Sequence, residues 1–179
     1  MKYDLWFHAY GTPAPKGSKE AYGNGRVESS KGVKPFEESI GWAAKMAIKK
    51  LPPELAKQFP LQGPLVAKFV FTVKRSTNKL RADAPSVRPD LSKYIRAAED
   101  GCNKLVWADD GNIVQYDTAA KTYPGRHPGA LDKPGVLIAV RRATHEELGL
   151  SLDSYQGKRY SQLLHMWGAD LYGDGARGV

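Results

Sequence analysis

Apolar side chains recur along this chain with two spacings, and each spacing predicts a type of element. Alternation of apolar and polar residues, together with strand-like composition, predicts four strands, at residues 3–10, 65–74, 113–122 and 136–141. We expect the strand at 65–74 to bury one face. Apolar positions at helical spacing predict a helix in which Pro35 takes the first position and which ends before Pro52.

A second helix is predicted to begin at Asp90. Aspartate is a preferred residue at a helix N-terminus, and Pro89 disfavours continuing the helix backward. The apolar residues that follow Asp90 recur at helical spacing as far as Leu105, which predicts one buried face. The helix should fray at residues 101–104, before a short loop leads into the strand at 113–122.

The segments between these elements have other compositions. Residues 11–34 are rich in Gly, Pro, Ser and Lys, which predicts a long loop or a hairpin. Thr144 and Glu147 have the spacing of a capping box that opens a short helix before Gly149. A further apolar stripe from Tyr160 to Leu171 predicts another helix, and we expect the last residues to form a frayed tail.

The order strand, helix, strand, helix, strand, strand predicts an α+β fold. Its sheet should be small, mixed or antiparallel, and covered by helices on one face. We expect one domain at residues 1–142 and a helical C-terminal extension at 143–179. That extension packs either on the same domain or on a second subunit, and the sequence does not decide between these alternatives.

Composition narrows the classes of function. The 179 residues are 41% apolar, which is typical of a globular protein, and no apolar run is long enough to cross a membrane. The single cysteine, Cys102, lies on the predicted buried face, and the four histidines have no zinc-binding spacing. A net charge of +8 favours a polyanionic partner such as nucleic acid, although many basic proteins bind none.

Carboxylates stand at both ends of the predicted helix and loop that begin at Asp90. Asp90 opens the helix, while Asp109 and Asp110 precede the next strand. Carboxylates that converge repel one another, and a divalent cation such as Mg²⁺ removes that cost. The alternative is structural, since an aspartate also caps helices and Asp-Asp-Gly also forms turns. Spacing alone leaves the two interpretations about equal.

The same stretch resembles a known family. PDLSKYIRAAEDGC at 89–102 and WADDGNIV at 107–114 are similar to the signature of the RusA-type Holliday junction resolvases, which are phage and prophage endonucleases. The resemblance aligns Asp90, Asp100, Asp109 and Asp110 with signature aspartates, and Arg96 with a catalytic lysine. It implies a RusA-like dimeric fold in which Asp90, Asp109, Asp110 and Arg96 are catalytic.

The family resemblance also implies partners and a location. It implies a homodimer in the cytoplasm of a bacterial host that cuts branched DNA, the four-way junction, with Mg²⁺ or Mn²⁺ and no small-molecule cofactor. The metal ligands would be Asp90, Asp109 and Asp110, completed by Asp100 or Glu99. A segment at 11–19, GTPAPKGSK, and Lys121 before Tyr-Pro-Gly extend the likeness.

One departure from the signature matters for activity. The second signature aspartate is Ser92 here, and the following asparagine is Lys93. Glu99 lies on the same helical face as Ser92 and could return the missing charge. The alternatives are a single-metal site or a relative that has lost cleavage. Arg96 keeps a cation for phosphate, but an arginine cannot plausibly donate a proton, so its role would be electrostatic.

Six basic residues are predicted to bind the DNA backbone: Lys16, Lys19, Arg88, Lys93, Arg96 and Lys121. Three hypotheses for function follow. The first is a Mg²⁺-dependent junction endonuclease, and the second is an inert protein that binds junctions on the same scaffold. The third is a basic globular protein with an RNA or protein partner. Cleavage of a four-way junction with and without divalent cation separates the first two, and the third predicts no preference for junctions over duplex.

Overall fold

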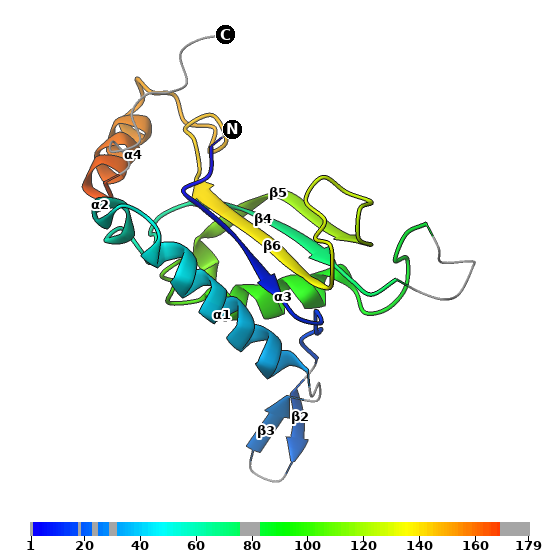
Figure 1. The fold of residues 1–179 in the computed structure, drawn as a ribbon. Coiled ribbons are helices and arrows are strands. Elements are labelled where there is room, and N and C mark those ends of the chain that lie inside the picture. Colours follow the sequence, from blue (N-terminus) through cyan, green and yellow to red (C-terminus); the bar gives the residue numbers. More distant parts are fainter. Residues whose placement is uncertain (1, 18, 23–24, 29–31, 76–82, 169–179) are drawn as a thin grey trace.

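The computed structural model describes residues 2–17, 19–22, 25–28, 32–75 and 83–168 (Figure 1). The strands are β1 (Leu5–Tyr10), β2 (Lys19–Tyr22), β3 (Gly25–Glu28), β4 (Leu65–Thr72), β5 (Ile113–Thr122) and β6 (Gly135–Arg142). The helices are α1 (Val33–Lys49), α2 (Pro53–Ala56), α3 (Leu91–Cys102) and α4 (Tyr155–Met166), with a 3₁₀ turn η2 (Asp110–Asn112). The predicted strands and the two main helices are confirmed, and the segment at 11–34 contains the β2–β3 hairpin.

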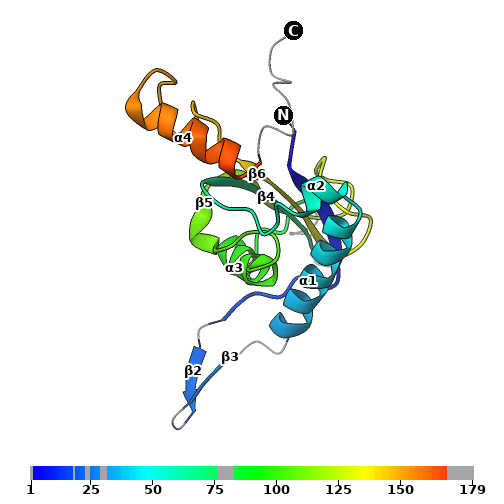
Figure 2. The same ribbon diagram turned by 90° about the vertical axis from the view of Figure 1, so that its left-hand side faces the viewer.

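Four strands form one mixed sheet in the order β1-β6-β4-β5. The strands β4 and β5 run parallel, whereas the other neighbours are antiparallel. Helices α1 and α3 cover one face of this sheet (Figures 1 and 2). The predicted α+β fold, with a small mixed sheet and helices on one face, is therefore confirmed and agrees with a RusA-like fold.

The core lies between these two helices and the sheet. Trp107 is fully buried, and its ring meets Phe69 of β4 edge-on with 6.5 Å between centroids. The helices approach closely at Gly101, where an added Cβ would lie 3.0 Å from the carbonyl oxygen of Glu37. The next residue, Cys102, is buried and free, as predicted. This packing fixes α3, and with it the residues that flank it.

Strand β4 differs from its prediction, because it is buried on both faces. Val66 and Val70, on the side away from the helices, are fully buried. Gly129 packs against Val70, and the backbone N–H of Leu131 donates to the Thr72 hydroxyl at 2.8 Å. A loop before β6 therefore covers the second face at Val70 and Thr72, which periodicity within β4 could not reveal.

Two helix predictions also need correction. Helix α1 begins at Val33, so Pro35 takes its third position, where a backbone N–H has no partner within the helix in any case. The predicted capping box exists, because Thr144 and Glu147 exchange hydrogen bonds of 2.8 and 3.2 Å. The chain nevertheless makes only turns there, and Gly149, with φ of +63°, ends them.

The C-terminal segment, as far as it is described, packs on the same chain. The Tyr160 hydroxyl donates to the Ala143 carbonyl at 2.7 Å, and the Arg142 guanidinium donates to the Trp167 carbonyl at 2.9 Å. The Trp167 ring lies over Gly63. None of the described helices is long and apolar enough to span a membrane.

Candidate functional site

Strand β5 and helix α3 together position the acidic residues. Near the end of β5, the Lys121 ammonium donates to the carbonyl of Pro89 at 2.8 Å, just before α3 begins. Further back on β5, the Tyr116 hydroxyl donates to Glu99 Oε1 at 2.5 Å, near the end of α3. These two contacts show that β5 runs alongside α3 in the opposite direction. The loop before β5 therefore returns to the C-terminal half of the helix.

The first group of site residues consists of Glu99, Tyr116, Asp110 and Arg96. Burial raises the pKa of Glu99, and the negative charge of Asp110 raises it further. The Tyr116 hydrogen bond and the Arg96 charge act in the opposite direction on that pKa. Burial, followed by the bond to Glu99, raises the pKa of Tyr116, which therefore stays a donor. Asp110 and Arg96 thus lie close enough to Glu99 for their charges to act on it, beside the Tyr116 hydroxyl.

The second group surrounds Asp90, at the start of α3. Asp90 is exposed and makes no capping hydrogen bond through its side chain. With Arg88 and Lys93 it lines a cavity of about 340 Å³. Burial lowers the pKa of Lys121, and the charge of Asp90 partly offsets this. Glu99 follows Asp90 by nine residues, which is about 13 Å along a helix axis.

The two remaining predicted acids are bound to lysines elsewhere. Asp100 forms an ion pair with Lys16, whose ammonium also lies 3.4 Å from Glu37. Asp109 accepts a hydrogen bond of 2.9 Å from the Gly111 N–H and lies 3.6 Å from the Lys104 ammonium. The Gly111 hydrogen bond, helped by Lys104, holds the pKa of Asp109 below its usual value.

The structure therefore brings some predicted residues together and keeps others apart. Within residues 83–168, which hold all five predicted acids, no three acids, histidines or cysteines lie close enough to share a metal ion. The Glu99–Asp110 pair still suits Mg²⁺, which is commonly held by one or two carboxylates together with waters and substrate phosphate. The mutual repulsion of the two carboxylates is the cost that such a cation would remove.

The predicted DNA-binding residues also differ in their surroundings. Arg88, Lys93 and Arg96 are exposed and available to a phosphate backbone. Lys16 and Lys121 instead bind groups of the chain itself. The structure describes the backbone of Lys19, in β2, but not its side chain.

Tyr116 belongs to the candidate site through its hydrogen bond to Glu99, and the sequence did not predict it. Tyr116 stands seventeen residues after Glu99 and in a different element, so neither helical nor strand periodicity could link the two residues. Its ring meets Phe69 edge-on with 5.9 Å between centroids, so the packed core holds the tyrosine in place. Only the docking of β5 beside α3 reveals the pair.

A basic protein with paired carboxylates beside an arginine fits a class of proteins, the nucleases that act on phosphodiesters. Residues 10–141 match the family described as Endodeoxyribonuclease RusA. The chain belongs to this family, and the match covers Asp90, Arg96, Glu99 and Asp110. Membership of this family supports the interpretation that the protein is an endodeoxyribonuclease of the Holliday junction resolvase type. Resolvases of the family generally depend on a divalent metal. Among curated proteins, the comparison finds no match.

Proposed function

We propose that this protein is a Mg²⁺-dependent endonuclease that cuts four-way DNA junctions in phage recombination or repair. The observation that carries the proposal is the Glu99–Asp110 pair beside Arg96, inside the part of the chain that matches the family. Mn²⁺ should substitute for Mg²⁺, since both accept oxygen ligands. No small-molecule cofactor is needed for hydrolysis.

Glu99 and Asp110 are the residues that we assign to the metal. The bound cation would neutralise charge on the phosphate and lower the pKa of an attacking water. Asp109 and Asp100 remain candidates for further ligands of this ion, whereas Asp90, about 13 Å from Glu99 along the helix axis, would have to hold a separate one. Of these, Asp109 is adjacent to Asp110 in sequence, while Asp100 would first have to leave Lys16.

Cationic side chains would complete the site. Arg96 lies beside Glu99 and is exposed, so its guanidinium can contact the scissile phosphate and stabilise the charge that develops there. Arg88 and Lys93, which line the cavity at Asp90, would hold the neighbouring backbone. Such contacts do not read base sequence, so binding should follow DNA shape and weaken steeply with salt.

The test is cleavage of a synthetic four-way junction and of a matched linear duplex, each with Mg²⁺ and with EDTA. We expect cation-dependent incision of the junction and little incision of the duplex. Binding of the junction with no incision at any concentration of Mg²⁺ or Mn²⁺ would contradict the proposal.

That contrary outcome is the prediction of a second candidate function, a junction-binding protein without cleavage activity. The observation that favours it is Ser92, a neutral and exposed residue where the signature has a carboxylate. Ser92→Asp separates the two candidates. If the natural chain only binds junctions because it lacks an aspartate at position 92, the Ser92→Asp variant should cut the junctions that the natural chain only binds.

We further propose that the enzyme acts as a homodimer. Resolution of a four-way junction requires two symmetric incisions, and a two-fold dimer presents two identical sites.

A further inference from the structure

The cavity of about 340 Å³ beside Asp90 has walls from two distant parts of the chain. The first wall belongs to residues 11–17, which lead from β1 past α3 to the β2–β3 hairpin (Figure 2). The second wall is the entry to α3. Both walls lie largely outside helices and strands, so side-chain contacts have to fix their positions. The residues that line the cavity are Pro15, Gly17, Arg88, Pro89, Asp90 and Lys93.

Lys16 anchors the first wall to two helices. Its backbone N–H donates to the carbonyl of Lys93, on α3, at 3.0 Å. Its ammonium forms an ion pair with Asp100, two turns further along α3, and lies 3.4 Å from Glu37 on α1. The Lys16 side chain is 22% exposed and does not line the cavity. Lys16 therefore holds the wall from behind, through contacts to both turns of α3.

Lys121, near the end of β5, anchors the second wall. Its ammonium donates to the carbonyls of Val87 and Pro89, the latter at 2.8 Å. These two carbonyls flank Arg88 and directly precede Asp90 in sequence. Lys121 is half-buried and does not line the cavity either. Its contacts therefore fix the backbone that carries Arg88 and leads into Asp90.

We propose that Lys16 and Lys121 are positioning residues, which promote cleavage by holding the two walls of the Asp90 cavity and do not contact DNA. The sequence predicts both as DNA-binding residues. An ammonium has three N–H donors, and here Lys121 already serves two carbonyls, while Lys16 serves two carboxylates. A phosphate would have to displace these partners, whereas Arg88 and Lys93 are exposed and line the cavity.

This inference rests on the proposed function, because cleavage of a junction is one of its readouts. It adds an assignment within that function, since Asp100 then serves as the partner of Lys16 and not as a metal ligand. Two other roles for the lysines make different predictions. A lysine that contacts phosphate contributes to the salt dependence of binding. A lysine that only stabilises the fold changes the free energy of unfolding, but not the rate of cleavage by folded protein.

The first experiment exchanges the charges of the Lys16–Asp100 pair. Lys16→Glu, Asp100→Lys and the double variant are compared in single-turnover cleavage at saturating junction and Mg²⁺. Each single variant should cut about 10- to 100-fold more slowly, which is the usual loss when residues that orient metal ligands are removed. The double variant keeps two acids and one base, Glu37 included, so it should recover most of the natural rate. If Lys16 contacted DNA, the double variant would cut no faster than Lys16→Glu.

Hydrogen exchange measured by NMR gives a second readout, which does not require cleavage. The amide of residue 16 should exchange slowly in the natural protein, because it bonds to the Lys93 carbonyl. It should exchange faster in both single variants and slowly again in the double variant. Far-UV circular dichroism checks that each variant is folded. If Lys16→Glu does not fold, Lys16→Met removes the ammonium without adding an acid, with the same expected losses.

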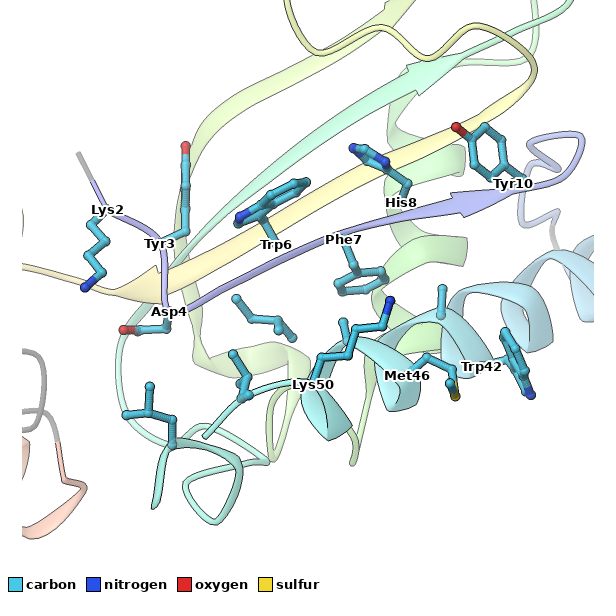
Figure 3. Close-up of a pocket in the computed structure, with 15 residues that line it drawn as sticks. Lys2, Tyr3, Asp4, Trp6, Phe7, His8, Tyr10, Trp42, Met46 and Lys50 are labelled. Carbon is cyan, nitrogen blue, oxygen red and sulfur yellow. The ribbon is translucent and has the colours of Figure 1, made fainter. Parts of the chain in front are cut away.

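The second experiment measures how junction binding in EDTA depends on salt. Each phosphate contact adds about 0.9 to the slope of log K against the logarithm of salt concentration. Lys121→Met should keep the natural slope and cut about 10- to 100-fold more slowly with Mg²⁺, whereas Lys93→Met should lose about 0.9 from the slope. Lys50→Met is the matched control, because Lys50 lines a separate groove of about 670 Å³ between α1 and β1 (Figure 3). It should keep both the slope and the rate.

A double variant that cuts no faster than Lys16→Glu, or a salt slope that falls by about 0.9 in Lys121→Met, would overturn the proposal. Natural cleavage rates in folded Lys16→Glu and Lys121→Met would also overturn it, because both lysines would then have a purely structural role. Absence of incision by the natural protein would instead contradict the nuclease assignment. Exchange at residue 16 and the salt slopes would still decide whether the lysines anchor the walls or contact DNA.

Discussion

Tyr116→Phe should weaken divalent metal binding while leaving the fold intact. The substitution removes only the hydroxyl that donates to Glu99 Oε1 at 2.5 Å. Phenylalanine keeps the ring that contacts Phe69, so the core beneath should not change. The variant therefore isolates the effect of holding Glu99 in one position next to Asp110.

The expected magnitude follows from the bond that is lost. A hydrogen bond to a charged group contributes about 1.5–3 kcal/mol. Because Tyr116 is 44% exposed, water can replace part of it, so we take the lower end, about 1.5 kcal/mol. This corresponds to about a tenfold higher dissociation constant for the metal. Loss of residues that orient metal ligands commonly costs about 10- to 100-fold in affinity or activity.

The assay is titration of the protein with Mn²⁺, followed by electron paramagnetic resonance, together with junction cleavage across a range of Mg²⁺ concentrations. We expect the half-saturating metal concentration to rise, with the cleavage rate at saturating metal little changed. Tyr155→Phe, at an exposed position on α4, is the control and should behave like the natural protein. An unchanged Mn²⁺ affinity of Tyr116→Phe would refute the assignment of Glu99 as a metal ligand positioned by Tyr116.

Three further outcomes are expected. Asp110→Asn should still bind junctions in a gel-shift assay but lose Mg²⁺-dependent cleavage, and undiminished cutting would exclude Asp110 as a ligand. Trp107→Ala should lower the free energy of unfolding, measured with urea, by about 3–5 kcal/mol, because Trp107 is fully buried. The Arg141 bond lowers the pKa of Glu147 from 4.5 to about 2. This stabilises the fold fully above pH 4.5, and the contribution is lost as the pH falls toward 2. In Glu147→Gln that part of the pH dependence of urea unfolding should disappear.

The sequence by itself determined the elements whose signals are local. Helix α3 could be placed because Pro89 and Asp90 mark its start and its apolar residues recur at one spacing. The alternating strand β1 and the buried position of Cys102 follow from the same periodicities. The candidate acids could also be named, since Asp90, Asp109 and Asp110 stand beside predicted boundaries.

Tertiary structure alone decided which of these residues meet. Glu99 binds the Tyr116 hydroxyl and feels the charge of Asp110, whereas Asp100 pairs with Lys16, although Glu99 and Asp100 are neighbours in sequence. Adjacent positions on a helix point about 100° apart, so the docking of α3 between β5 and the segment before β2 assigns each acid a different partner. The second face of β4 is likewise covered at Val70 by a loop distant in sequence, the one that contains Gly129. Local periodicity shows which face of an element is apolar, but it does not show which other element packs against that face.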